Sequence, residues 1–372
     1  MHKEFSDPIH KFVKAYDCEL RLIDSPVLQR LRFVKQLGVA YLVFPSAQHT
    51  RFEHSLGTME LAGRMCQSLG IKDGKLCSLY RLAGLLHDVG HLPFSHTTEV
   101  LLGDKSHEEI GERLIKEGLV GSLLLKCGYA YEDIELLCRM AFRKDFNPLP
   151  KVITGEFGAD RMDYLIRDAY FCGTSYGFFD YERLLNNLLL VDGKKCLHIS
   201  SLRALESFII GRYFMYSQVY FHRVVRILNI HLNELIMDLI KQGALELDNL
   251  HLRTDAHILS LLLERQEDPK VRRLLFREHY REVFSTSSKE LYEYAKERLT
   301  ERYEPELLRF DRAYKKVLEE DILLFDGSKL LSVKEVSPMV SSLKDIEVYR
   351  IYAHPSYKEE VKGFVNGALK RA

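Results

Sequence analysis

The chain has 372 residues, of which 46% are hydrophobic and 28% are charged, enough for a substantial core in one large domain or two ordinary ones. Its 53 Lys and Arg residues equal its 53 Asp and Glu residues, which argues against broad electrostatic binding of nucleic acid but leaves a local basic patch open. No apolar run reaches the length of a membrane span, and the opening residues MHKEFSDPIH lack a signal-peptide pattern, so we expect a cytoplasmic protein without membrane contact.

Helical patterns dominate the chain. Segment 106–118 starts with Ser followed by acidic residues, which suits a helix dipole, and segment 159–173 ends at Gly. Segment 201–243 is periodic throughout, so it must form one very long helix or two helices joined near Gly211. The segments that carry apolar residues at helical spacing are 25–38, 55–70, 74–91, 106–118, 159–173 and 201–243.

Strand signals are few. LLLVDGKKCLHI (188–199) predicts a hairpin that turns at Asp192 and Gly193, and ILLFDGSKLLSV (322–333) predicts a weaker one. IEVYRIYA (346–353) alternates as a half-buried strand does.

These elements predict a mainly α-helical protein with short β-hairpins. We expect a core domain over residues 1–245 and an accessory lobe over residues 246–372, with charged helices in 252–320 and a β-containing tail. The seven cysteines, at 18, 66, 77, 127, 138, 172 and 196, are odd in number and form no CxxC pair. Reduced, mostly buried thiols are therefore expected rather than disulfides or a zinc knuckle.

The stretch GLLHDVGHLPFSH (84–96) concentrates His87, Asp88, His91 and His96 beside apolar helix residues. Buried imidazoles are costly unless something uses them. His87 and His91 are four residues apart, so both would point to the same side of a helix. A metal held by His87 and Asp88 would then lie at the helix end.

Further ligands for such a metal must come from elsewhere in the chain. RFEHSLG supplies His54 and FGADRMDYLIRD supplies Asp160, each just before or inside an expected helix. A helix N-cap would explain Asp160 equally well when it is considered alone.

The motifs RFEHSLG, LLHDVGHLPFSH and ADRMDYLIRD resemble those of the HD-domain phosphohydrolases, and more narrowly the deoxynucleoside triphosphate triphosphohydrolase branch. The similarity extends over residues 20–230 and includes the long stretch IDSPVLQRLRFVKQLGVAYLVFPSAQHTRFEHSLG. It implies an HD-domain helical core with a C-terminal mixed α/β lobe.

The resemblance implies that His54, His87, Asp88 and Asp160 bind one divalent metal. Two neutral imidazoles and two carboxylates balance a dication and leave positions for water and a phosphate oxygen. The mixed donor set suits Mn, Fe, Co, Ni or Zn and tolerates Mg, and the sequence does not choose among them. Such a metal lowers the pKa of bound water and draws charge from a phosphoryl group.

The same resemblance assigns catalytic roles near the metal. His91 and His107 would line the phosphate site, and His96 would donate a proton to the leaving oxygen. Glu99 would orient His96, because i,i+3 spacing on a helix lets the carboxylate reach the imidazole. The family residue at that position is Asp, so Glu99 is a departure, and an ordinary surface position at a helix start is the alternative for His107.

The resemblance also implies a set of substrate contacts. Arg51 and Arg161 would lie near the phosphates, with Arg161 in place of a family Lys, which keeps the charge but changes the donor geometry. Tyr164 and Asp168 would contact the sugar 3′-hydroxyl. The remaining expected contacts are Gln36 and Leu37 with the sugar, and Arg212, Tyr220, His222 and Arg223 with the triphosphate and base. Ordinary core packing is the alternative for Leu37 and for the aromatic residues.

The leading functional hypothesis is a metal-dependent phosphohydrolase in which water attacks the α-phosphorus of a dNTP and releases nucleoside and triphosphate. Two alternatives stay open: an HD phosphomonoesterase, phosphodiesterase or nuclease, and a nucleotide-sensing protein with little turnover. The expected partners are nucleotides and a second copy of the chain, as a dimer or tetramer. Arg30, Arg32 and Lys35 match nucleotide-linked positions of related enzymes, or form an ordinary solvated face.

Overall fold

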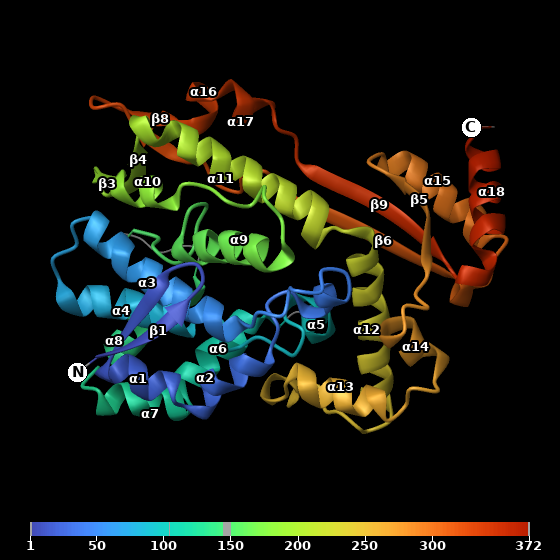
Figure 1. Ribbon diagram of the computed structural model, residues 1–372, viewed down its shortest axis with the longest axis horizontal. Coiled ribbons are helices and arrows are strands. Elements are labelled where there is room, and N and C mark those ends of the chain that lie inside the picture. The colour runs from blue at the N-terminus through green and yellow to red at the C-terminus, as the bar shows by residue number, and fades with distance from the viewer. Residues whose placement is uncertain (1, 104, 144–149, 371–372) are drawn as a thin grey trace. The chain divides into compact units, whose positions relative to one another are not determined.

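The computed structural model describes residues 2–103, 105–143 and 150–370, and helices predominate in them (Figure 1). The prediction of a mainly α-helical protein with short hairpins is confirmed. In the described part of the chain, no helix has both the length and the apolar character needed to cross a bilayer.

The chain divides into two compact units. Unit 1 comprises Met1–Met215, Asp248–Asp255 and Leu318–Leu343, and unit 2 comprises Tyr216–Leu247, Ala256–Val317 and Lys344–Ala372. The expected boundary at 245/246 does not coincide with this division, because two later segments of the chain return to unit 1.

Unit 1 contains most of the helices and two of the sheets. Its helices are α1 (Asp17–Ile23), α2 (Pro26–Arg30), α3 (Arg51–Ser68), α4 (Gly74–Leu86), α5 (His96–Glu99), α6 (His107–Lys116), α7 (Leu119–Lys126), α8 (Tyr131–Phe142), α9 (Ala159–Cys172), α10 (Tyr181–Asn186), α11 (Leu202–Met215), α16 (Val333–Val336) and α17 (Pro338–Ser342). Its strands are β1 (His2–Asp7), β2 (Lys11–Tyr16), β3 (Leu188–Val191), β4 (Lys194–His198), β7 (Leu323–Phe325) and β8 (Leu330–Ser332).

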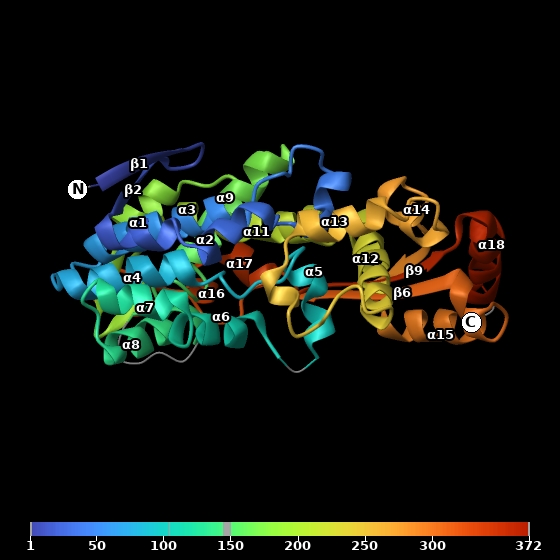
Figure 2. The ribbon, with the colours of Figure 1, turned by 90° about the horizontal axis from the view of Figure 1, so that it is seen from below.

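Helices α3, α4 and α9 form the centre of unit 1 and lie side by side (Figure 1, Figure 2). Helix α4 begins at Asp73, whose carboxylate accepts hydrogen bonds from the backbone N–H groups of Lys75 and Leu76. Helix α9 ends where predicted, at Gly173, which takes the left-handed conformation with φ 68°. Helix α3 begins at Arg51 rather than at residue 55, because Glu53 caps the backbone N–H of Thr50.

Both predicted hairpins are confirmed, and tertiary structure joins them into one sheet. Strands β3 and β4 pair antiparallel around Asp192 and Gly193, which both have positive φ, and β7 pairs antiparallel with β8. Strand β4 then pairs in parallel with β7, giving the order β3-β4-β7-β8. The first hairpin, β1–β2, which turns within residues 8–10, was not predicted.

Unit 2 consists of a three-stranded antiparallel sheet and five helices. Its elements are α12 (Arg223–Lys241), α13 (Asp255–Leu263, whose first residue belongs to unit 1), α14 (Pro269–Leu275), β5 (Arg281–Thr286), α15 (Lys289–Thr300), β6 (Leu308–Lys315), β9 (Ile346–Ala353) and α18 (Lys358–Leu369). The expectation of charged helices throughout 252–320 is therefore wrong for β5 and β6.

Strand β9 is the central strand, in the order β5-β9-β6. On one face Tyr349 and Ile351 join a core built with α15 and α18, and on the other face Tyr352 packs against Ile227 of α12 (Figure 1, Figure 2). The strand expected over 346–353 is confirmed, but it is covered on both faces rather than half-buried.

The periodic segment 201–243 breaks at residues 216–222, where a π-helical turn (Tyr216–Tyr220) separates α11 from α12. Of the two expected alternatives the chain forms two helices, but they join after residue 215 rather than at Gly211, which lies inside α11. Gly211 allows close packing instead, since a Cβ there would lie 2.8 Å from the carbonyl oxygen of Tyr176. Segment 25–38 is also less regular than expected, because α2 ends at Arg30 and a 3₁₀ turn follows.

One disulfide corrects the expectation that all thiols are reduced. Cys18 of α1 and Cys127 after α7 are bonded, with Cα atoms 5.8 Å apart and a sequence separation of 109 residues. The five remaining cysteines are free, and all but Cys77 are buried. A pairing across such a sequence separation leaves no local pattern, so the sequence alone could not reveal it.

Candidate metal centre

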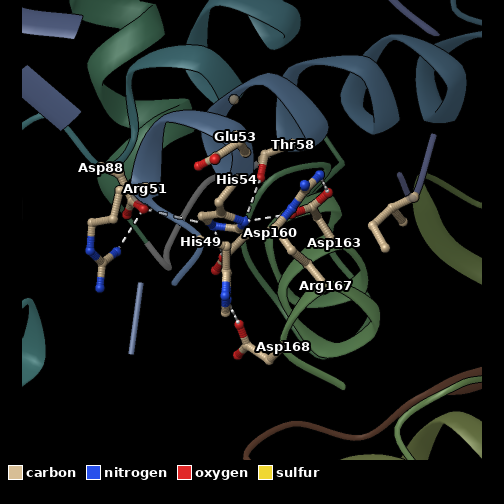
Figure 3. Close-up of polar contacts among 12 residues, drawn as sticks. His49, Arg51, Glu53, His54, Thr58, Asp88, Asp160, Asp163, Arg167 and Asp168 are labelled. Atoms are coloured by element: carbon tan, nitrogen blue, oxygen red, sulfur yellow. Dashed lines mark hydrogen bonds and ion pairs between the residues drawn. The ribbon is translucent and has the colours of Figure 1, made fainter. Parts of the chain in front are cut away.

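Three helix ends bring the predicted metal ligands together. His54 lies in the first turn of α3, and Asp160 lies in the first turn of α9. Helix α4 ends at Leu86, so His87 is its C-cap residue and Asp88 follows in the turn. These four residues form the quartet, and all but Asp160 are buried; Figure 3 labels His54, Asp88 and Asp160.

Donor atoms of His54, His87 and Asp160 all lie within 4.8 Å of one another, and Asp88 contacts the two imidazoles of this group. His54 Nε2 is 3.2 Å from His87 Nε2, 3.2 Å from Asp160 Oδ1 and 3.7 Å from Asp88 Oδ2. His87 Nε2 is 3.3 Å from Asp88 Oδ1 and 3.7 Å from Asp160 Oδ1. Donors bound to one metal at ~2.1 Å are separated by about 3.0–3.5 Å, so these spacings suit a shared cation.

The second ring nitrogen of each imidazole decides which nitrogen can ligate. His87 Nδ1 lies 2.7 Å from the carbonyl oxygen of Gly84, which can only accept, so Nδ1 carries the proton. His54 Nδ1 likewise lies 2.7 Å from Asp163 Oδ2. In the neutral imidazoles both Nε2 atoms would therefore carry lone pairs, and two lone pairs 3.2 Å apart repel each other unless a proton or a metal cation lies between them. The quartet accordingly fits a divalent metal.

The electrostatics of the quartet also favour a positive charge at its centre. Burial opposes a charge on His54, but hydrogen bonds to Asp160 and Asp163 and the charge of Asp88 raise its pKa to about 10. Burial likewise opposes ionisation of Asp88, yet Arg51, His87 and His91 hold the pKa of its carboxyl well below the usual range. Without a metal, the site would hold protons in its place.

Asp160 is the accessible member of the quartet, with 32% of its side chain exposed. Burial opposes its ionisation, but hydrogen bonds to His54 and His87 lower its pKa. Solvent and substrate can therefore reach the quartet at this carboxylate, which remains ionised and able to ligate.

The predicted catalytic residues form a second imidazole cluster next to the quartet. Ring nitrogens of His91, His96 and His107 lie within 4.8 Å of one another. His96 Nδ1 is 2.8 Å from Glu99 Oε2, and His107 Nδ1 hydrogen bonds to the other oxygen of Glu99. The contact that i,i+3 spacing allows between His96 and Glu99 is therefore present, and Glu99 also holds His107.

His91 connects this cluster to the quartet, since its Nε2 lies 3.3 Å from Asp88 Oδ1. It does so from the loop after α4 rather than from the same helix face as His87, because α4 ends at Leu86. Burial and the nearby Arg51 and His107 lower the pKa of His91 well below its ordinary value, so it is neutral. His96 is the exposed member of the cluster and can meet a leaving group.

The two predicted phosphate-site arginines are both held by acidic residues. Arg51 is buried and donates from Nη1 to Asp88 Oδ2 at 2.6 Å and from Nε to Ser95 Oγ at 2.6 Å. Arg161 donates to Glu156 at 2.5 Å and to Glu319 at 3.2 Å. Arg51 thus acts on a quartet carboxylate, while Arg161 shares its charge with two acids.

Of the predicted sugar contacts, Tyr164 and Asp168 lie on α9 with Asp160, whereas Gln36 and Leu37 precede α3. The Tyr164 ring is 6.4 Å from the His54 ring, centroid to centroid, and Asp168 accepts a hydrogen bond of 2.7 Å from His49 Nε2 (Figure 3). Gln36 is buried, its Oε1 has no hydrogen-bond partner among the described residues, and its backbone N–H bonds to the carbonyl oxygen of His49. Leu37 is half-buried.

The remaining predicted contacts fall in different units. Arg212 of α11 is buried in unit 1 and donates to Glu156 at 3.2 Å, which places it beside Arg161 on the same carboxylate. Tyr220, His222 and Arg223 belong to unit 2, so their contacts with a substrate stay predictions.

Four residues that support the quartet and its surroundings were not predicted from the sequence: His10, His49, Asp163 and Arg167. The i,i+4 spacing of Asp163 and Arg167 in DRMDYLIR was a usable signal for an ion pair. His10 and His49 come from segments without helical periodicity, and no local pattern identifies them.

Two family models match the chain. The HD domain model matches residues 51–146, and the HD associated region model matches residues 179–370, just over half of the chain. An uncharacterized protein of Methanocaldococcus jannaschii is 34% identical over 97% of this chain and 80% of its own length. The chain belongs to the HD-domain phosphohydrolase family.

Solved structures contain the same fold as this HD-domain phosphohydrolase. A hypothetical protein from Aquifex aeolicus is 49% identical with a TM-score of 0.89, covering 98% of this chain and 99% of that chain. A phosphohydrolase from Bacteroides thetaiotaomicron has a TM-score of 0.79 at 22% identity, covering 95% and 100%, and this likeness concerns the fold alone. The expected HD-domain helical core is confirmed.

Two further relatives match a smaller part of this chain, and both are longer than it. The deoxynucleoside triphosphate triphosphohydrolase SAMHD1 of Gallus gallus is 31% identical over 62% of this chain and 44% of its own length. An uncharacterized protein of Bacillus subtilis is 37% identical over 63% of this chain and 55% of its own length. The chain spans about half the length of these two relatives. This HD-domain phosphohydrolase is accordingly a hydrolase with a His/Asp donor set that can hold a divalent metal.

Proposed function

We propose that this HD-domain phosphohydrolase cleaves deoxynucleoside triphosphates into deoxynucleoside and inorganic triphosphate. The observation that carries the proposal is the quartet of converging donors, His54, His87, Asp88 and Asp160, directly beside the imidazole cluster. The similarity to SAMHD1, 31% over 62% of this chain, supports the substrate class. A nucleotide-sensing role would not need a proton donor next to the metal donors.

In the proposed reaction, water forms a bond to the α-phosphorus, and the bond from that phosphorus to the 5′ oxygen of the sugar breaks. A divalent metal on the quartet would supply Lewis acidity and lower the pKa of water. His96 would give a proton from Nε2 to the departing 5′ oxygen, since its Nδ1 is hydrogen bonded to Glu99. The triphosphate leaves as an anion.

The other residues of the site bind and orient the substrate. His107, which is hydrogen bonded to Glu99, would donate to phosphate oxygens. Arg161, the residue after Asp160, would offer a guanidinium to the same phosphates. Tyr164 and Asp168 present a hydroxyl and a carboxylate from one face of α9, where a sugar hydroxyl can be bound. Nucleotides are the proposed partners, and assembly into a dimer or tetramer remains part of the proposal.

The test is product identification with defined metals. Protein stripped of metal and reloaded with Mn, Fe, Co, Ni, Zn or Mg is incubated with single dNTPs and with a mixed pool, and products are separated by ion chromatography. Inorganic triphosphate and deoxynucleoside are the expected products. Release of phosphate or diphosphate alone, or cleavage only of monophosphates, cyclic dinucleotides or single strands, would contradict the proposal.

A variant pair tests the proton donor. His96→Gln is expected to lower kcat by about 10²–10⁴-fold, because a proton donor is lost, while metal binding is retained. His198→Gln is the matched control, since His198 of β4 is also hydrogen bonded through Nδ1, to Ser200 at 2.8 Å, and lies outside both clusters. Equal kcat in the two variants would contradict the role of His96.

A further inference from the structure

Behind His54, on the ring edge opposite the quartet, lies a buried carboxylate with four hydrogen-bond donors. Asp163 Oδ2 accepts from His54 Nδ1 at 2.7 Å and from Arg167 Nε at 2.8 Å. Its Oδ1 accepts from Arg167 Nη2 at 2.9 Å and from His10 Nε2 at 2.6 Å. Figure 3 labels Asp163 with His54 and Arg167. Asp163 with these three partners is named the Asp163 hub.

The hub connects α9 to the turn of the N-terminal hairpin. His10 follows strand β1 in that turn, and Arg167 donates from Nη1 to Asp7 Oδ2 at 2.8 Å. Asp7 Oδ1 in turn accepts from the backbone N–H groups of Ile9 and His10, at 2.9 and 2.8 Å. The hairpin turn therefore contacts the hub twice, once through His10 and once through Asp7.

Because Asp163 is charged and buried, the loss of any one hydrogen-bond donor of the hub would leave its carboxylate incompletely compensated. The side chains of Asp163 and Arg167 are both 0% exposed, and His10 is 1% exposed. A buried carboxylate requires compensation, and here all its lone-pair directions are used by a guanidinium and two imidazoles. The hub is also tightly enclosed, since a Cβ on Gly57 of α3 would lie 1.9 Å from Asp163 Oδ1.

The hub has a direct consequence for the metal donors. An ionised Asp163 can only accept, so it keeps the proton of His54 on Nδ1 and the lone pair on Nε2. It also sets the ring plane of His54, because the imidazole must keep this contact while its Nε2 lies 3.2 Å from Asp160. Carboxylates in this position raise the basicity of a ligating imidazole.

We infer that Asp163 is a positioning residue for the metal centre and that the N-terminal hairpin, through His10 and Asp7, supports it. This inference rests on the proposed metal site. The alternative is a buried ion pair that stabilises the fold and leaves the metal affinity of the quartet unchanged. Metal binding, measured without any substrate, separates the two roles.

The experiment titrates intact protein with Mn²⁺ and follows free Mn²⁺ by electron paramagnetic resonance. Asp163→Asn is expected to weaken Mn²⁺ binding by about 10–100-fold, as loss of a partner behind a ligating histidine does. His10→Ala is expected to weaken it in the same direction and to a smaller extent, because Asp163 keeps its remaining donors.

Asp311→Asn is the matched control for buried carboxylates. Asp311 of β6 is 4% exposed in its side chain and is hydrogen bonded by the Arg226 guanidinium, as Asp163 is by Arg167, but it belongs to unit 2 and contacts no member of the quartet. We expect this variant to lose stability and to bind Mn²⁺ as the unchanged protein does.

A spectroscopic measurement reports the tautomer directly. In ¹⁵N–¹H correlation spectra of Zn²⁺-loaded protein, His54 is expected to carry its proton on Nδ1, and Asp163→Asn is expected to disturb that signal. If Asp163→Asn does not fold, Gly57→Ala and His10→Ala replace it, because both disturb the hub while leaving the carboxylate in place.

The outcomes distinguish this inference from the proposed function. If the unchanged protein binds no Mn²⁺, the metal site itself is refuted. If the unchanged protein binds Mn²⁺ and the hub variants bind it within twofold of that affinity, the positioning role is refuted and the hub is a structural ion pair. Weakened binding in the hub variants but not in Asp311→Asn supports the role.

Discussion

Metal binding to the quartet should release protons, because the metal-free site holds positive charge of its own. Hydrogen bonds to Asp160 and Asp163 raise the pKa of His54 to about 10 against the opposing effect of burial. A metal can use His54 Nε2 only after a proton on that nitrogen has left. The affinity for metal should therefore increase as the pH rises towards 10.

The size of the effect follows from this pKa. At pH 8 the proton is bound with a pKa about 2 units above the pH, so its removal costs about 2.7 kcal/mol, or ~100-fold in apparent affinity. Between pH 6.5 and 8.5 the apparent Kd should fall about tenfold per pH unit, ~100-fold in total. At least one proton per metal should be released at pH 7.5.

Isothermal titration calorimetry at pH 7.5 in buffers of different ionisation enthalpy, such as HEPES and Tris, counts the protons released. A parallel series at pH 6.5, 7.5 and 8.5 gives the change in Kd. His54→Ala should lose both the affinity and the proton release. A Kd that stays constant across this range, together with zero proton release in the unchanged protein, would refute the reasoning.

Three further predictions concern stability and the phosphate side of the site. Replacing Cys18 and Cys127 by Ser should lower the free energy of unfolding by about 2–4 kcal/mol, since the disulfide joins residues 109 apart in sequence. Urea denaturation with and without reductant measures this loss of stability. Equal unfolding midpoints for the variant and the unchanged protein would contradict the prediction. Burial raises the pKa of Asp255 from 3.8 to about 6, so the folded state binds a proton more tightly than the unfolded state, and stability falls by about 2.4 kcal/mol as the pH rises from 4 to 7. Asp255→Asn should lack this component, and parallel slopes for both proteins in urea unfolding at pH 4, 5, 6 and 7 would argue against it. Glu319→Gln should change the free energy of unfolding by less than about 1 kcal/mol, because the ion pair of Glu319 with Arg161 is partly exposed. The same variant should bind dNTP about two- to fivefold more tightly. Measurement of KM, or competition with inorganic triphosphate, checks this change in affinity.

Much of the fold followed from local patterns, and the failures have identifiable causes. Helix α9 and both hairpins formed where their stop and turn residues predicted, because Gly173 and the pair Asp192-Gly193 act within a few residues. A helix junction near Gly211 was one of two predictions for segment 201–243. This glycine instead allows close packing against the backbone of Tyr176. Strands β5 and β6 were not predicted because charged residues interrupt their apolar pattern, and their apolar residues join a core with α15 and α18 that only the tertiary structure brings together.

The candidate site divides in the same way. The residue types and spacing of His87, Asp88, His91 and His96, together with the family resemblance, predicted which side chains could converge. The structure adds that α4 ends before His87, so His91 reaches Asp88 from a loop rather than from the helix face expected. Spacing alone could not give this, because the helix end depends on the turn that follows it.

The sequence by itself determined the kinds of donors, the helices that carry them and the family to which the chain belongs, since these depend on residue identity and short-range spacing. Only the tertiary structure decided which imidazole nitrogen faces the quartet, because Gly84 and Asp163 occupy the other one. It also decided that His10, more than 150 residues from Asp163, shares a buried carboxylate with His54. Hydrogen bonds between distant segments leave no periodic trace in a sequence, since they depend on how the chain packs rather than on local order.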